Sequence, residues 1–273
     1  MNYRHAYHAG NHTEVFKHAA LTLLLDHLRL KEKPFAVLDT HSGVGYYDLQ
    51  STEARKTQEW EEGVRKIFDR PLSSAPTYSE LLKNLNPGGL AIYPGSPEII
   101  LRSLRPGDRL IANELHPDDH DLLSIRYRLS RGVTVQNRDG YDAINATVPP
   151  LERRGLVFVD PPFEKSDEVH AMCKGLAKGL KKWGTGIFCL WYPYKTSSIG
   201  DALAKFAEEN GFQETLRADF LTFPPDGVSL AGGGLLICNT PWKFDEKLCN
   251  LCSELKSIFK KSSYSISWVT KPK

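Results

Sequence analysis

Short apolar runs with the pattern of strands alternate with amphipathic helical patterns along most of the sequence. The strand-like runs lie at residues 35–38, 109–113, 133–136, 156–159 and 186–190. The helical patterns between and around them lie at residues 13–31, 117–129, 169–182 and 199–210. Strands that alternate with helices build parallel sheets, because each crossover helix returns the chain to the same edge. We therefore predict a Rossmann-like α/β fold: a mostly parallel sheet with helices on both faces.

The alternation is interrupted at residues 52–92, which are charged, helical in pattern and without a convincing strand. We expect a small helical insertion there, followed by a helix with Ser96 as its cap and Pro97 in its first turn. Two late strands, at 214–223 and 235–239, are predicted to flank a glycine-rich loop at 232–234, and residues 242–259 to form a helix. The expected organisation is one domain, 1–273, with an N-terminal arm at 1–12 and the insertion at about 52–92.

Acidic residues end four of the predicted strand segments. Asp39 precedes a glycine turn that contains Gly43 and Gly45, and Glu114, Asp139 and Asp160 end later segments. Ligands of open parallel sheets bind at the carboxyl ends of the strands. Glu114 suits the two ribose hydroxyls of a nucleoside, a feature that nicotinamide and S-adenosylmethionine enzymes share. The turn lacks a full G-x-G-x-x-G, which argues against a dinucleotide.

The segment Asp160-Pro-Pro-Phe163 distinguishes between these classes, because it follows a buried strand. Two prolines fix the backbone and remove two amide donors. The Asp160 carboxylate and the Pro161 carbonyl can then accept hydrogen bonds from the exocyclic amine of a base, and Phe163 offers a stacking surface. This predicts methyl transfer to a base amine, and it requires Asp160 to face the cofactor pocket and not to be turned away into a structural ion pair.

Charge and aromatic patterns permit a nucleic-acid partner without demanding one. The net charge is +2, so phosphate binding would depend on clustered cations. Lys174, Lys178 and Lys181 share one helix face, and we assign them only a weak phosphate-binding role. The segment 191–195, Trp-Tyr-Pro-Tyr-Lys, is placed after the fifth strand, where it could frame a flipped base or pack at the edge of the core.

Cysteine and histidine usage indicates a cytoplasmic protein and no metal site. The five cysteines are an odd number without a disulfide spacing, and Cys249 and Cys252 are interpreted as packing on a helix face. No signal peptide or membrane span is expected. The histidine-rich start of the chain fits no zinc spacing, so we interpret it as a polar arm over the ligand, with a solvated arm as the alternative.

Several of these motifs together resemble one enzyme family, the bacterial 23S rRNA (adenine(2030)-N(6))-methyltransferases, RlmJ. The matching pieces are Tyr3-Arg-His-Ala-Tyr-His-Ala-Gly-Asn-His12, Lys17-His18, Leu38-Asp-Thr-His-Ser-Gly43, Tyr93-Pro-Gly-Ser-Pro97, Asn113-Glu-Leu-His-Pro117, Asp139-Gly140 and Asp160-Pro-Pro-Phe163. The resemblance runs from the first residues past the middle of the chain. The aromatic end of the glycine turn departs from it, and the last third carries fewer matching motifs.

The resemblance implies a Rossmann-like S-adenosylmethionine-dependent methyltransferase with a small helical insertion. Its substrate would be one adenine of 23S rRNA, free or in early assembly, and it would act as a monomer. Asp160 would be the catalytic acceptor, with Pro161 and Phe163 beside it, and Tyr3 would contact the RNA. Carried over residue by residue, the cofactor contacts are His18, His41, Ser96, Glu114, Asp139, Gly140 and Asp160.

Other interpretations stay open at this point. The same Asp-Pro-Pro-Phe segment occurs in enzymes that methylate a guanine amine of ribosomal RNA. A DNA adenine target is disfavoured because no recognition domain for duplex DNA is evident. A non-catalytic RNA-binding module would have no need of Asp39, Glu114 and Asp160 together. A nicotinamide oxidoreductase lacks both its glycine fingerprint and a Tyr/Lys pair.

Overall fold

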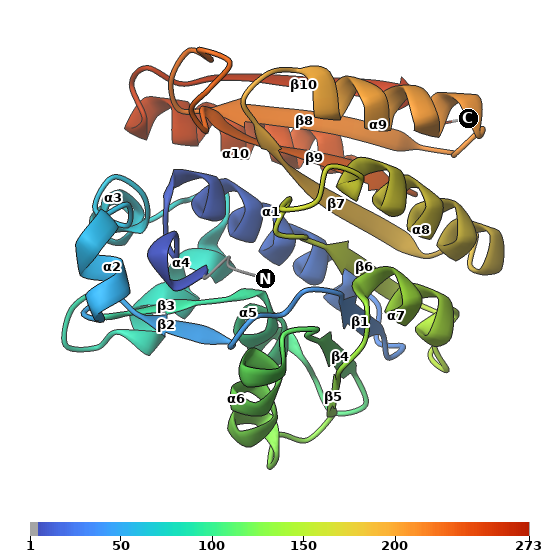
Figure 1. The fold of residues 1–273 in the computed structure, drawn as a ribbon, viewed down its shortest axis with the longest axis horizontal. Coiled ribbons are helices and arrows are strands. Elements are labelled where there is room, and N and C mark those ends of the chain that lie inside the picture. Colours follow the sequence, from blue (N-terminus) through green and yellow to red (C-terminus); the bar gives the residue numbers. More distant parts are fainter. Residues whose placement is uncertain (1–4, 273) are drawn as a thin grey trace.

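An eight-stranded sheet forms the centre of the computed structural model, which describes residues 5–272 (Figure 1). In the order β10-β8-β9-β7-β6-β1-β4-β5, the strands from β7 to β5 are parallel, whereas β9, β8 and β10 pair antiparallel. The prediction of a mostly parallel sheet is therefore confirmed. The bounds are β1 (Ala36–Asp39), β4 (Arg109–Asn113), β5 (Val133–Gln136), β6 (Gly155–Val159), β7 (Ile187–Tyr194), β8 (Thr215–Leu221), β9 (Gly232–Cys238) and β10 (Ser263–Thr270).

Helices cover both faces of the sheet, as predicted. Successive side chains of a strand point to opposite faces, so Val37 and Phe158 join a hydrophobic cluster with α1, α5 and α10, whereas Leu38 and Val159 join one with α7, α8 and α9. None of the described helices is both long and apolar enough to cross a membrane. The bounds are α1 (His12–Arg29), α5 (Ser96–Ser103), α6 (Pro117–Tyr127), α7 (Gly140–Thr147), α8 (Glu168–Lys182), α9 (Ser198–Glu209) and α10 (Phe244–Ile258).

Helix α1 is buried along most of its length, polar residues included. It packs against α4, α5, β9 and α10 and lies in the middle of the molecule (Figure 1). Asn11 caps its first turn: the side-chain oxygen accepts from the amides of Thr13 and Glu14, both at 3.0 Å. A short 3₁₀ helix, η1 (His5–Tyr7), precedes it. The N-terminal segment is thus held against the body of the protein.

The segment predicted as a helical insertion, 52–92, contains three short helices and ends where a strand begins. They are α2 (Thr52–Thr57), α3 (Val64–Asp69) and α4 (Pro76–Leu85), and α3 and α4 pack against α1. On either side of them, β2 (Tyr46–Asp48) and β3 (Ile92–Pro94) pair as a separate two-stranded antiparallel sheet. The division of the chain into one domain with an arm and an insertion stays a prediction.

Some predicted boundaries were wrong, mainly in the C-terminal half. Residues 232–234 lie in β9 and not in a loop, because they pair with both β7 and β8. Glycine is required at 233 because an added Cβ would meet Nε1 of Trp191 at 2.6 Å. Strand β7 continues to Tyr194, so residues 191–194 of the segment predicted to follow it belong to the sheet and only Lys195 lies beyond it. Elements η1, β2, β3, β10 and α7 were not predicted.

Candidate active site

A cavity of about 700 Å³ opens at the carboxyl ends of the parallel strands. Ser42 and Gly43 follow β1, Glu114 follows β4 and Asp160 follows β6, and all four line the cavity. Because these ends meet at one edge of the sheet, segments that are far apart in the sequence converge there.

The described residues that sequence reasoning assigned to cofactor and catalysis line this one cavity. They are His18, His41, Ser96, Glu114, Asp139, Gly140, Asp160, Pro161 and Phe163. Tyr3, assigned to the RNA, lies outside the described residues. Trp191 and Lys195 also line the cavity, whereas Lys174 and Lys178 lie on a separate groove.

The glycine turn after β1 is tied to the end of β4. Gly43 has a φ of +60°, which favours glycine, and its amide donates to Oε2 of Glu114 at 2.8 Å. The amide of His116 donates to Oε1 of Glu114, also at 2.8 Å. Burial raises the pKa of Glu114, and these amide hydrogen bonds oppose the rise. Each carboxylate oxygen keeps a further lone pair for a ligand hydroxyl.

Asp139 and Gly140 form the start of α7. Asp139 caps the helix by accepting from the amides of Tyr141 at 2.9 Å and Asp142 at 3.3 Å. The His41 ring lies against Gly140, where an added Cβ would be 2.5 Å from its Cε1 atom. Burial lowers the pKa of His41 to about 4, so the ring is neutral near pH 7. Glycine is required here so that His41 can reach the cavity wall.

Ser96 does not cap α5, contrary to the prediction. Gly95 is the cap residue, and Ser96 is the first residue of the helix. Its hydroxyl donates to Oδ2 of Asp39 at 2.7 Å, while Oδ1 of Asp39 is buried without a hydrogen-bond partner among the described residues. Burial raises the pKa of Asp39 to about 7. Ser96 therefore links the end of β1 to the helix that follows β3.

The Asp160–Phe163 turn has an unusual backbone. Phe163 adopts a φ of +53°, a left-handed conformation that costs a non-glycine residue about 1–3 kcal/mol. Its ring contacts Trp191 edge-on, with centroids 5.9 Å apart. Strain of this kind persists only where surrounding packing imposes it, and here it holds an aromatic face at the cavity.

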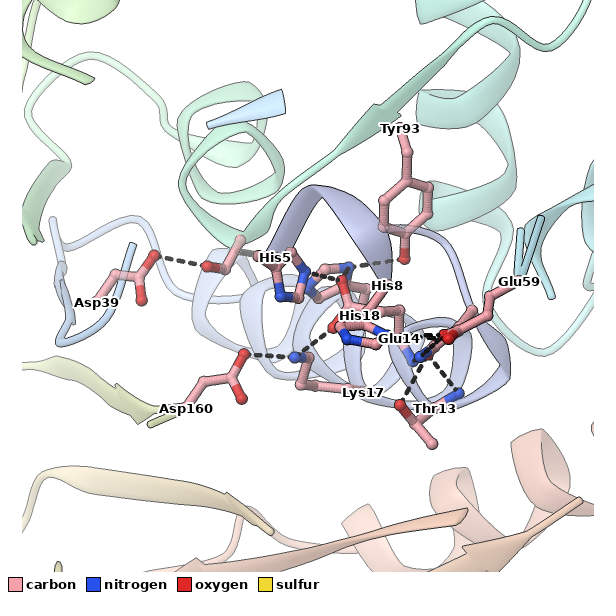
Figure 2. Close-up of polar contacts among 12 residues, drawn as sticks. His5, His8, Thr13, Glu14, Lys17, His18, Asp39, Glu59, Tyr93 and Asp160 are labelled. Carbon is pink, nitrogen blue, oxygen red and sulfur yellow. Dashed lines mark hydrogen bonds and ion pairs between the residues drawn. The ribbon is translucent and has the colours of Figure 1, made fainter. Parts of the chain in front are cut away.

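Lys17 is the main site residue that sequence reasoning missed, since it was noted only as part of a motif. Its ammonium forms ion pairs with both Glu14 and Asp160, as Figure 2 shows. The ammonium also lies 4.7 Å from the centroid of the Trp191 ring. Burial would lower the pKa of Lys17, but the two carboxylates raise it, so the ammonium stays charged. The signal that could have identified Lys17 is its position as a charged residue in a helix that is buried on all sides.

The ion pair with Lys17 does not turn Asp160 away from the cavity. The side chain lines the cavity and is 13% exposed. Oδ2 binds Lys17, while Oδ1 makes no hydrogen bond to the described residues. Burial raises the pKa of Asp160 and Lys17 counteracts this effect. Asp160 is thus both paired and accessible to a ligand.

Two histidines of the N-terminal segment, His5 and His8, bind carboxylates. Nε2 of His5 lies 2.8 Å from Glu14, and Nδ1 of His8 lies 2.9 Å from Glu59. Burial would raise the pKa of Glu14, but Lys17, His5 and His18 lower it well below the usual range. Within residues 5–272, no three His, Cys, Asp or Glu side chains are grouped so as to hold a metal ion.

Comparisons with known proteins identify the family. A sequence model described as "Ribosomal RNA large subunit methyltransferase D, RlmJ" matches residues 32–270. The chain is 36% identical to the ribosomal RNA large subunit methyltransferase J of Haemophilus influenzae, over 99% of both chains. It is also 36% identical to the protein of that name from Escherichia coli, over 94% of this chain and 93% of the relative.

A solved structure extends the comparison to three dimensions. The crystal structure of protein LPL1258 from Legionella pneumophila, titled as a member of family DUF519, superposes with a TM-score of 0.87 at 33% identity. The match covers 96% of this chain and 98% of that one. The resemblance seen in the motifs is therefore confirmed, and the chain belongs to the RlmJ family of ribosomal RNA large subunit methyltransferases.

Proposed function

We propose that this protein transfers a methyl group from S-adenosylmethionine to the N6 amine of an adenine in 23S rRNA, by resemblance adenine 2030. The observation that carries the proposal is that the Asp160–Phe163 turn lines the same cavity as Glu114, Asp139 and Gly140. One cavity therefore contains both hydrogen-bond acceptors for a base amine and residues suited to binding a nucleoside.

The residues around the cavity fit S-adenosylmethionine. Glu114 offers anchored carboxylate oxygens for ribose hydroxyls, and Gly43 allows close approach of the backbone. His18, His41, Ser96, Asp139 and Gly140 would complete its site. The cofactor supplies an activated methyl group, because its sulfonium is a good leaving group.

The protein's own contribution is orientation and acceptance of protons. The Asp160 carboxylate and the Pro161 carbonyl accept hydrogen bonds from the two amine hydrogens of the target base. The amine nitrogen, whose lone pair is otherwise delocalised into the ring, is then directed toward the methyl group. Lys17 favours the ionised form of Asp160 and fixes its position, and the Asp160 carboxylate can accept the proton that the amine releases once the N–C bond has formed. Phe163 stacks on the base.

An Asp160→Ala variant tests this assignment. We expect methyl transfer from tritiated cofactor to unmethylated 23S rRNA to disappear while binding of S-adenosylhomocysteine persists. Full activity in this variant would remove Asp160 from its role. Mass spectrometry of nucleosides from the wild-type reaction separates N6-methyladenosine from N2-methylguanosine, the product of the rival guanine reaction.

Several further assignments belong to the same proposal. We expect the protein to act in the cytoplasm, as a monomer, on free or early-assembly 23S rRNA, with Tyr3 touching the RNA. Light scattering on the purified protein tests the monomer. Comparing naked 23S rRNA with assembled large subunits as methyl acceptors tests the substrate state.

A further inference from the structure

A row of buried hydrogen-bonding groups runs from the cavity wall into the core. Nδ1 of His18 lies 2.8 Å from the Tyr93 hydroxyl, which lies 3.2 Å from the Tyr78 hydroxyl. Both tyrosines are fully buried, and His18 is 2% exposed although it lines the cavity. Figure 2 shows the contact between His18 and Tyr93. The row therefore reaches the ligand space through one imidazole ring.

The protonation state of His18 sets what this ring can offer. Burial lowers the pKa of His18 to about 3, so the ring is neutral near pH 7 and carries one proton. A neutral imidazole donates from one nitrogen and accepts at the other. Whether His18 presents a hydrogen-bond donor or an acceptor to the cavity depends on which ring nitrogen carries the proton.

Counting donors along the row selects the tautomer. The Tyr78 hydroxyl has no partner among the described residues besides Tyr93. If Nδ1 of His18 donated to Tyr93, then Tyr93 would donate to Tyr78, and the Tyr78 proton would be buried without an acceptor, which is costly. If Tyr78 donates to Tyr93 and Tyr93 donates to Nδ1, both hydroxyl protons are accepted. The second arrangement leaves the proton of His18 on Nε2.

The charged groups near His18 do not reverse this choice. Oε2 of Glu14 lies 3.9 Å from Nδ1, beyond hydrogen-bonding distance, and it accepts instead from His5 at 2.8 Å. The other oxygen of Glu14 binds Lys17. Among residues 5–272, Nδ1 of His18 therefore has one hydrogen-bond partner, the Tyr93 hydroxyl, and Nε2 is the nitrogen left for the cavity.

We propose that Tyr93, held by Tyr78, is a positioning residue that fixes His18 as the Nε2–H tautomer. The ring then offers a neutral hydrogen-bond donor to an acceptor oxygen of the bound methyl donor. The contact with the methyl donor rests on the proposed function, whereas the tautomer does not.

Nitrogen-15 NMR of the histidine rings tests the tautomer in the free protein, because protonated and unprotonated ring nitrogens have distinct chemical shifts. We expect Nε2 of His18 to carry the proton in the wild type and the two forms to mix in Tyr93→Phe. Binding of S-adenosylhomocysteine to Tyr93→Phe should weaken by about three- to ten-fold, the loss of one net hydrogen bond.

Two further variants separate positioning from stability. Tyr78→Phe removes a buried hydroxyl of the same row but keeps the partner of Nδ1, so we expect the Nε2–H signature to remain. The double variant Tyr78→Phe/Tyr93→Phe removes the unpaired hydroxyl that Tyr93→Phe leaves behind. It should recover melting temperature relative to Tyr93→Phe without recovering ligand affinity. Tyr264→Phe, on the edge strand β10, is the matched control for loss of a tyrosine hydroxyl.

An Nδ1–H signature in the wild type would overturn the proposal, as would recovery of full affinity in the double variant. Unchanged affinity and ring shifts in Tyr93→Phe would do the same. If the tautomer is as expected but no RNA is methylated, the proposed function fails and the positioning role of Tyr93 stands.

Discussion

The buried cluster of Glu14, Lys17 and Asp160 predicts opposite outcomes for two substitutions. Its formal charge is −1, because one ammonium lies between two carboxylates. Asp160→Ala removes one carboxylate and leaves Lys17 matched with Glu14. Lys17→Met keeps the volume of the side chain but leaves two carboxylates facing each other in a buried place. The first change should disable the chemistry, and the second should also destabilise the fold.

The magnitudes follow from the burial of the cluster. Removing one partner of a buried ion pair costs about 3–5 kcal/mol. At roughly 2–3 °C per kcal/mol for a domain of this size, Lys17→Met should lower Tm by about 6–15 °C. Asp160→Ala should change Tm by only a few degrees, roughly 1 kcal/mol, because no buried charge loses its last partner. The rate of methyl transfer by Asp160→Ala should still fall by about 10²- to 10⁴-fold or more, because a positioned proton acceptor contributes a factor of this order.

The effect of pH on Lys17→Met has a definite sign. Without the ammonium, repulsion and burial raise the pKa of one of the remaining carboxyl groups in the folded state. A carboxyl group whose pKa is raised by folding loses stability as the pH rises through that value. The Tm deficit of Lys17→Met should therefore be larger at pH 8 than at pH 5. Adding Glu14→Gln leaves a single carboxylate and should restore much of the lost Tm.

Thermal unfolding followed by circular dichroism, with methyl transfer measured in parallel, checks these expectations. Lys66→Met is the matched control, because Lys66 forms an exposed pair with Glu62 and should shift stability by less than about 1 kcal/mol. A Lys17→Met protein as stable as the wild type at pH 8 would refute the charge argument. A double variant with Glu14→Gln that is less stable than Lys17→Met alone would refute it equally.

Three further predictions concern single positions around the cavity. Because burial raises the pKa of Asp39 to about 7, the unfolding free energy should fall as the pH rises from about 4 to about 7. Asp39→Asn should flatten that profile in denaturant titrations. Gly140→Ala should displace His41 and weaken S-adenosylhomocysteine binding at least about ten-fold by calorimetry, roughly 1.4 kcal/mol, whereas Gly88→Ala, which meets open space, should bind normally. Phe163→Leu should raise the KM for RNA by about five-fold or more through lost stacking, with little change in cofactor affinity, and an unchanged KM would remove the stacking role.

Four of the five parallel strands, β1, β4, β5 and β6, could be predicted to within one residue, whereas β7 extends to Tyr194. Strands β4 and β5 begin and end where predicted, because each is a short strand-like run bounded by polar or glycine residues. Most of β4 is buried, whereas β5, at the edge of the sheet, is partly exposed. Strand β10 was missed although Tyr264, Ile266 and Trp268 alternate with more exposed neighbours, the usual signal of an edge strand. The glycines of β9 could not be placed, because the side chain that requires Gly233 belongs to β7.

The same distinction holds for the site. Glu114, Asp139 and Asp160 were found because each ends a strand segment, and the sheet brings such ends together. Lys17 was missed because one of its two partners, Asp160, lies 143 residues away and nothing in its own helix indicates that contact. Local pattern predicts where a strand ends, whereas burial of a charge depends on what the rest of the chain places around it.

Helix α1 is made early in synthesis, yet it reaches its buried environment late. Lys17 of this helix pairs with Asp160, and the helix packs against β9 and α10. During translation, most of the polypeptide must be synthesised before the Lys17 ammonium can be buried together with the carboxylates of Glu14 and Asp160. A chain that ends before β9 would contain α1 but no complete active site. We therefore expect methyltransferase activity only in chains whose translation has passed β9.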